Sequence, residues 1–101
     1  MLLLGSVFSQ PLSIIESKSA IESKKYSKAL KKITKGLEKD KKLVELNYLK
    51  AWAEFEMALE EEESKEQQRA YRGVLRSLEK AEQKDPAREY RDTYQWLYSR
   101  F

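Results

Sequence analysis

The side chains that could do chemistry in this 101-residue chain are carboxylates, because the sequence contains no Cys and no His. Zinc fingers, disulfide scaffolds, thiol nucleophiles and imidazole catalysis are thereby excluded. The nearest arrangement to an acid-base pair is Glu54 with Glu61, beside the run of four Glu at 60–63. On a helix these carboxylates lie on a solvated face, and no Gly-rich loop accompanies them. We expect no enzyme, no cofactor and no metal site.

The charges are unevenly distributed, although the formal net charge is only +3. Between Lys18 and Lys42 ten Lys stand against three acidic residues, a local charge of +7. Between Leu43 and Glu66 eight Glu stand against two Lys, a local charge of −6. Nucleic-acid binding uses Arg and stacking aromatics, whereas the Lys-rich stretch has no Arg and one Tyr. We expect the two stretches to attract each other as antiparallel helices, and we do not expect a nucleic-acid partner.

The elements that position these residues are expected to be helices throughout. The chain has the length of one small domain, with 41% hydrophobic and 37% charged residues. Three Gly and two Pro are too few for the many turns of an all-β fold. The sequence therefore predicts an all-α fold.

The first nine residues differ from the rest, because residues 1–10 carry no charge. They resemble a truncated signal peptide without its basic start, with cleavage before Gln10. The alternative is a helical turn from Leu2 to Phe8, packed on the first hairpin. We expect a periplasmic or secreted protein, and otherwise a cytoplasmic one. The apolar run is too short for a transmembrane segment, which needs about twenty residues.

Apolar periodicity and boundary residues predict five helices. Ser13 with Glu16, and Ser64 with Gln67, have the spacing of a capping box at a helix start. The expected helices span residues 12–24, 26–37, 43–62, about 64–81, and 86–101. The alternative at the third boundary is that the Glu and Gln run continues the third helix, with the break anywhere between residues 60 and 69. In the first of them the residues expected to be buried are Leu12, Ile15, Ala20 and Ile21.

The third expected helix, 43–62, is apolar around most of its circumference. Such a helix is buried on two sides, so it should be the central element, with Trp52 between two hairpins. A narrow polar strip remains on it, and its end at 60–63 should project into solvent. The residues of the strip are Asn47, Lys50, Glu54 and Glu61.

The last expected helix begins at Asp85 and Pro86, which suit the N-cap and the first helical position. Its aromatic side chains have no further helix to cover them. We therefore expect an exposed docking surface, through which the chain self-associates. The residues of this surface are Tyr90, Tyr94, Leu97, Tyr98 and Phe101.

The second and fourth expected helices share one pattern. Tyr26-x-x-Ala29-Leu30-x-x-Ile33-x-x-Gly36 is matched by Tyr71-x-x-Val74-Leu75-x-x-Leu78-x-x-Ala81, ahead of Pro86. Both resemble the second helix of a tetratricopeptide repeat, whose period of about 34 residues places Ser17 and Ala51 at the small position of the first helices. The resemblance implies a right-handed solenoid with units at about 10–43 and 44–86 and the first helix of a third at 87–101. The alternative is a plain helical bundle.

The resemblance implies a non-catalytic scaffold for protein-protein interaction, whose concave face holds a peptide or partner protein. No small-molecule substrate is implied. The alternative is a structural N-terminal part of a longer exported protein whose activity lies downstream, and a minor alternative is a nucleic-acid-binding helical bundle. The residues expected near the concave face are Lys18, Asn47, Lys50, Glu54 and Arg91.

Overall fold

The computed structural model describes residues 11–100. The expected signal peptide at 1–9 and the exposure of Phe101 therefore lie outside the described residues. The described part is all-α, as predicted, and contains no strand. Its helices are α2 (Leu12–Glu22), α3 (Tyr26–Lys39), α4 (Glu45–Leu59), α5 (Ser64–Gln83) and the single turn α6 (Gln95–Tyr98).

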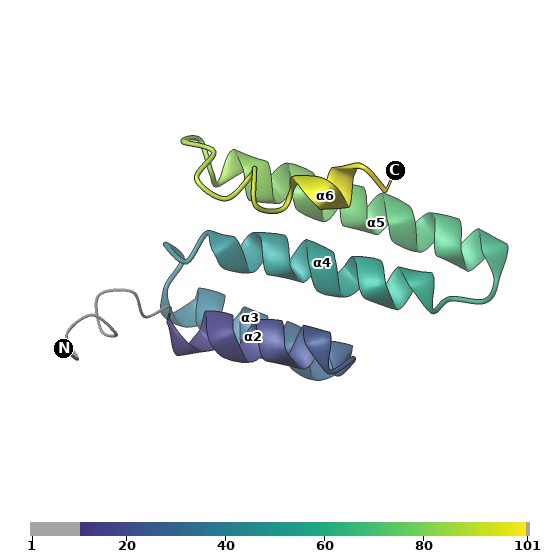
Figure 1. The fold of residues 1–101 in the computed structure, drawn as a ribbon, viewed down its shortest axis with the longest axis horizontal. Coiled ribbons are helices and arrows are strands. Elements are labelled where there is room, and N and C mark those ends of the chain that lie inside the picture. Colours follow the sequence, from purple (N-terminus) through teal and green to yellow (C-terminus); the bar gives the residue numbers. More distant parts are fainter. Residues whose placement is uncertain (1–10, 101) are drawn as a thin grey trace.

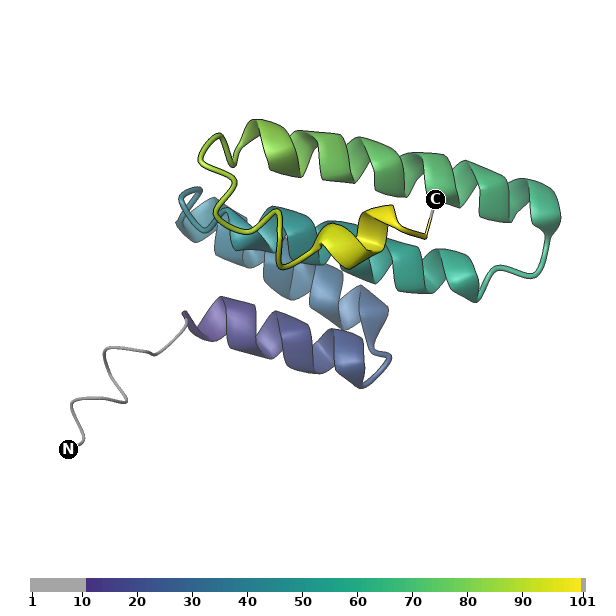
Figure 2. The ribbon, with the colours of Figure 1, turned by 45° about the horizontal axis from the view of Figure 1, so that its top comes forward.

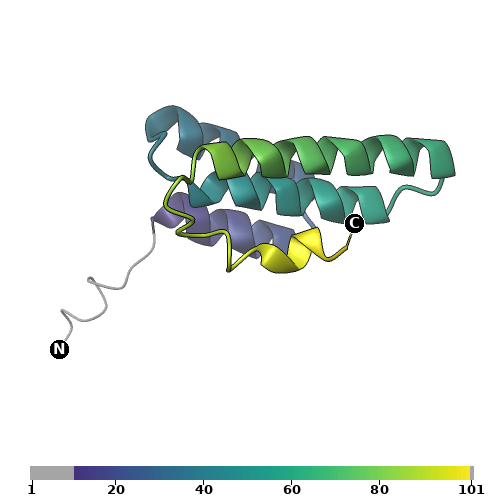
Figure 3. The ribbon, with the colours of Figure 1, turned by 90° about the horizontal axis from the view of Figure 1, so that it is seen from above.

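Helix α4 is the central element, which confirms the expectation from its apolar circumference. It packs against α2, α3 and α5, and Figure 1 shows it between α5 and the α2–α3 hairpin. Viewed from above, α2 and α6 lie on one side of α4 and α3 on the other (Figure 3). Nine of its fifteen residues are buried. The core therefore runs along α4 and is closed by its neighbours.

The apolar stripes of α3 and α5 are largely buried, as their periodicity predicts, but Leu75 of the predicted α5 stripe is 42% exposed. Helix α3 buries Tyr26, Ala29, Ile33 and Gly36. Helix α5 begins at Ser64, after the exposed run at 60–63, and neither Ser64 nor Ser13 caps a helix with its side chain. The capping-box predictions are therefore wrong, although the helix starts are close to those expected. The buried residues of α5 are Val74, Leu78 and Ala81.

Helix α2 buries Ala20 and Ile21 as predicted, but at its start it buries a different face from the predicted one. Ile14 and Ser17 point into the core, whereas Leu12 and Ile15 are 67% and 46% exposed. The apolar and small residues of this helix are spread around its axis, so periodicity could not choose between the two faces. Glu16, expected to cap the helix, forms an ion pair with Lys32 of α3 instead.

At Gly36, α3 lies close to two other helices. A Cβ atom added at Gly36 would lie 2.7 Å from Leu46 Cδ1 of α4 and 3.0 Å from Ser13 Cβ of α2. Real Cβ atoms do not tolerate such a contact without a shift of their neighbours, and so the backbone requires a residue without a side chain here. This glycine lets three helices meet at one point.

The predicted last helix, 86–101, is wrong. After α5 the chain runs through turns from residue 84 to residue 94, and only Gln95–Tyr98 are helical. The carboxylate of Asp85 accepts hydrogen bonds from the backbone N–H groups of Glu89 (2.8 Å) and Tyr90 (3.1 Å). Asp85 thus caps a turn, not a helix. The segment then folds back along α4, between α5 and α2 (Figure 2).

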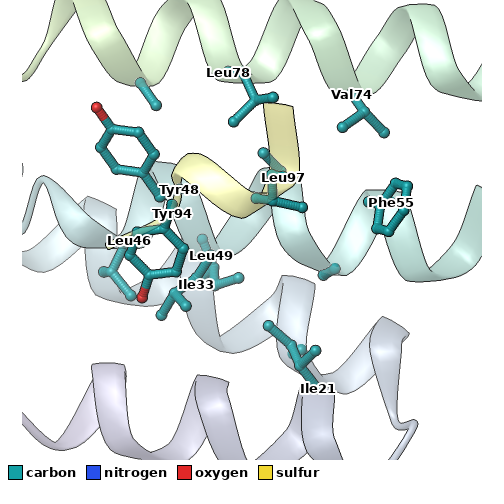
Figure 4. Close-up of a cluster of buried hydrophobic side chains, with 14 of the residues drawn as sticks. Ile21, Ile33, Leu46, Tyr48, Leu49, Phe55, Val74, Leu78, Tyr94 and Leu97 are labelled. Atoms are coloured by element: carbon teal, nitrogen blue, oxygen red, sulfur yellow. The ribbon is translucent and has the colours of Figure 1, made fainter. Parts of the chain in front are cut away.

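The C-terminal segment is consequently part of the core, not an open surface. Tyr94 is 3% exposed and Leu97 is fully buried, while Tyr90 and Tyr98 are half-buried. The prediction of an exposed docking surface is therefore wrong for Tyr94 and Leu97. The reason for expecting self-association, an uncovered aromatic surface, is also lost. Figure 4 shows Leu97 among side chains of α4 and α5. Self-association itself stays a prediction.

Trp52 is half-buried, not enclosed between two hairpins as expected. Its indole N–H donates to Glu56 Oε2 at 3.3 Å, and its ring meets the ring of Trp96 edge to face at 5.8 Å. Trp96 is itself 38% exposed. The two tryptophans form the outer edge of the contact between α4 and the C-terminal segment.

Candidate protein-binding surfaces

Two tyrosines and two buried carboxylates join α4 to the C-terminal segment. The hydroxyl of Tyr48 donates to Asp85 Oδ2 at 2.9 Å, and the hydroxyl of Tyr94 donates to Glu45 Oε2. Glu45 also forms an ion pair with Lys18 Nζ at 3.2 Å. Both carboxylates are about 95% buried, so each needs these partners to offset the cost of leaving water. This network is structural.

The pKa values of these groups follow from the same contacts. Burial raises the pKa of the Tyr48 and Tyr94 hydroxyls, and their hydrogen bonds to Asp85 and Glu45 raise the pKa further. Burial alone would raise the pKa of Asp85. The hydrogen bonds from Tyr90, Glu89 and Tyr48 outweigh it and lower the pKa of that carboxyl. At neutral pH the tyrosines are therefore neutral donors and Asp85 is a charged acceptor.

The five residues expected near a concave face do not converge on one site. Lys18 is bound to Glu45, and Arg91 Nε lies 3.4 Å from Glu82 Oε1, with its guanidinium over the Tyr98 ring. These two cations hold the fold together. Asn47 is buried and donates to the carbonyl oxygen of Val44 at 3.2 Å. Only Lys50 and Glu54 lie on an accessible strip of α4.

Glu54 is part of a groove of about 390 Å³ between α3, α4 and α5. Ala58 forms the buried part of its lining, Leu30 comes from α3, and Ala70 and Gly73 come from α5. Met57, 41% exposed, and the carboxylates of Glu54 and Glu61 complete it. We call this surface the α3–α5 groove. Its size is that of a small binding site, and its lining combines apolar atoms with two acidic groups.

Gly73 faces the open space of the α3–α5 groove. No atom lies within 4 Å of a Cβ added at Gly73, in contrast to the crowded position of Gly36. A glycine inside a helix destabilises it by about 1 kcal/mol relative to alanine. No contact within the described residues requires glycine at this position. The sequence does carry a signal for this position, because Gly73 is the only glycine in α5 and lies inside a segment that is otherwise predicted to be helical.

A second surface that was not predicted from the sequence is the outward face of α5. Five cations at a spacing of three or four residues follow one line along the helix, opposite the buried stripe, and all are exposed. They span about 22 Å at 1.5 Å per residue. The charge count by segment did not reveal this line, because it summed these cations with the acidic residues of the same helix, Glu66, Glu79 and Glu82. The residues of this cationic row are Lys65, Arg69, Arg72, Arg76 and Lys80.

The predicted attraction between the Lys-rich and Glu-rich helices is not visible as direct pairing. Across the part of the chain that the structure describes, no ion pair joins a lysine of α3 to a glutamate of α4. Within residues 11–100 no group of acidic side chains is arranged to hold a metal ion. None of the described helices is long and apolar enough to cross a membrane.

Comparisons with protein-family models, curated proteins and solved structures find no match to this chain.

Proposed function

We propose that the chain is a non-catalytic protein-binding module and that the α3–α5 groove is its binding surface. The observation that carries the proposal is Gly73, a helical glycine above open space in a groove with an apolar lining. A glycine of this kind lets the backbone or an apolar side chain of a ligand approach the helix closely. The destabilisation that it brings is explained if binding depends on that approach.

The lining of the groove indicates the chemistry of the ligand. Leu30, Ala58 and Ala70 would contact an apolar side chain. Glu54 and Glu61 would receive a cationic group beside it, although the carboxylate of Glu54 already accepts a hydrogen bond from Ser77. The expected ligand is a peptide segment with an apolar residue flanked by Lys or Arg.

A tetratricopeptide-like arrangement of the two hairpins belongs to this proposal. The small positions of the proposed first helices, Ser17 and Ala51, are fully buried, and so is Ala29 of the second helix. Two layers would follow from such a stack, with the first helices on one side and the second helices on the other. The groove proposed here lies between second helices, α3 and α5. The side of the first helices is partly covered by the chain's own C-terminal segment (Figure 2).

The test is to fill the groove without disturbing the core. A displayed library of random short peptides is selected on the wild-type chain, and the selected peptides are measured on Gly73→Leu. The leucine side chain would enter the open space, so we expect affinity to fall about tenfold or more. Gly73→Ala, which adds one methyl group where the ligand would approach the helix, should weaken binding measurably but less than Gly73→Leu does.

A third variant controls for the general effect of a new leucine. Arg72→Leu changes an exposed neighbour on the outward face of α5 and should leave binding unchanged. Circular dichroism checks that each variant is folded. If the selected peptides bind Gly73→Leu as tightly as the wild type, the groove is not the binding surface. If no peptide is enriched, the proposed function is wrong for peptide ligands.

The cationic row of α5 supports a second candidate function, contact with nucleic acid. Its three Arg and two Lys are exposed on one line, which suits contacts with a phosphate backbone. Arg69 also forms an ion pair with Glu66, with 3.4 Å between Nη1 and Oε1. Binding of duplex DNA or RNA that weakens steeply with salt, and is lost in Arg72→Glu with Arg76→Glu, would favour this candidate. No binding at low salt would exclude it.

A further inference from the structure

The open side of the α2–α3 hairpin carries a seam that nothing in the described chain covers. Helix α4 packs on the other side of this hairpin (Figure 1). Along the open side lie two adjoining hollows of about 350 and 300 Å³, which share Glu16 and Lys32. We call the two hollows together the lysine seam. Its cations come from one edge of α3 and the turn before it: Lys25, Lys28, Lys32, Lys35 and Lys39.

The lysine seam has a large excess of positive charge. Glu16 is its one carboxylate, and it is paired with Lys32 at 3.1 Å. Within residues 11–100 the other four lysines form no ion pair. Four like charges along one edge repel one another, and a partner with carboxylates would relieve that repulsion.

The seam also has an apolar wall. Leu12 and Ile15 of α2 line it with 67% and 46% of their surface exposed, and Ala20, Gly36 and Leu43 lie deeper. A purely electrostatic contact would not require this wall. A partner that matches both parts carries apolar residues beside acidic ones, which is the pattern of an acidic amphipathic helix.

The shape of the seam favours a helix. From Lys25 to Lys39 it extends for about 21 Å at 1.5 Å per residue, the length of about four helical turns. Helix α4 already packs along the opposite side of the same two helices. We propose that the lysine seam is the docking site for an acidic amphipathic helix of a partner protein. This surface is separate from the α3–α5 groove, so each proposal can fail without the other.

Other occupants fit the seam less well. Among the described residues its lining contains no Arg and no aromatic residue, the residue types that nucleic-acid contacts favour. Residues 1–10 have no acidic side chain to meet the lysines.

The probe is a fluorescent amphipathic peptide of Leu and Glu, about 18 residues or five turns long, titrated with the full chain. We expect binding that depends on the order of its residues. A peptide with the same composition, shuffled so that it has no apolar face, should bind about tenfold more weakly. An amphipathic peptide of Leu and Lys should not bind.

Two charge-reversed variants locate the contact. Lys28→Glu with Lys35→Glu changes exposed residues of the seam and should weaken peptide binding about tenfold or more. Lys65→Glu with Arg72→Glu makes the same change of net charge on α5 and should have less than about a twofold effect. If the seam variant fails to fold, Lys28→Gln with Lys35→Gln is measured instead. Leu12→Ser with Ile15→Ser should also weaken binding.

Four results would overturn the proposal. The first is equal loss of binding in the seam and α5 variants, and the second is equal binding of the ordered and shuffled peptides. The third is that the peptide does not bind, whereas phosphatidylserine vesicles or duplex DNA bind the wild-type chain and do not bind the seam variant. The fourth is sedimentation in which the seam variant abolishes dimers of the chain, because a second copy is then the occupant.

Discussion

The rings of Tyr48 and Tyr94 stack at 5.4 Å with 10° between their planes, and their hydroxyls bind different carboxylates. Tyr48 reaches Asp85 at the end of α5, and Tyr94 reaches Glu45 at the start of α4. The two hydroxyls point in opposite directions from the stacked rings (Figure 4). The pair therefore joins α4, the end of α5 and the C-terminal segment in one buried contact.

We predict that Tyr94→Phe destabilises the chain by about 1–3 kcal/mol, because a buried carboxylate of Glu45 loses a donor and keeps only Lys18. Urea unfolding measures the change. In a double-mutant cycle with Glu45→Gln the two effects should differ from additivity by more than about 0.5 kcal/mol. Additive effects would mean that the Tyr94 hydroxyl and Glu45 do not interact in solution.

Two glycine substitutions should change stability in opposite directions. Gly36→Ala places a methyl group against Leu46 and Ser13, and we expect a loss of about 1–3 kcal/mol. Gly73→Ala meets no atom and should gain about 0.5–1 kcal/mol from helix propensity. Urea unfolding of both variants decides the matter. A gain at Gly36 would show that the three helices are further apart than described.

Ser17→Ala should leave the stability unchanged or raise it by up to about 1 kcal/mol. The hydroxyl of Ser17 is fully buried and has no hydrogen-bond partner within residues 11–100. Replacing it by a methyl group removes the cost of burying an unpaired polar group. Ser19→Ala on the exposed face of the same helix measures the effect of propensity alone. A loss at Ser17 larger than about 0.5 kcal/mol would reveal a partner for the hydroxyl.

Acid should weaken the fold through Asp85. Because its pKa is lowered in the folded chain, its stabilisation is present above the ordinary pKa of about 3.9 and is lost as the pH falls through the folded value. Asp85→Asn should therefore be less stable than the wild type at neutral pH, and the difference should shrink at acidic pH below about 3.9. Urea unfolding at several pH values tests this. A difference that does not depend on pH would show that the charge of Asp85 is not what stabilises the turn.

The sequence predicted the α3 and α5 stripes and the central position of α4, because their apolar residues define a single face or nearly cover the helix. It could not predict which face is buried in the first half of α2, since Ile14 and Ile15 are neighbours and either one could point inward, whereas Ala20 and Ile21 are buried as predicted. It also failed after Asp85. Local spacing there suits a helix, yet contacts with residues far back in the chain, such as Tyr48, hold that segment in turns. Of the five expected partner residues, only Lys50 and Glu54 lie on an accessible strip of α4, because charge and spacing do not show which cations the fold itself uses.

The most direct test of the proposed binding surface is to map a selected peptide on the chain by NMR, following the backbone amide resonances during titration. The proposal predicts that the largest shifts occur at Leu30, Ala58, Ala70 and Gly73, with little change at Tyr48 or Tyr94. Shifts concentrated on α2 or on the segment from Tyr90 to Tyr98, with none around Gly73, would contradict it.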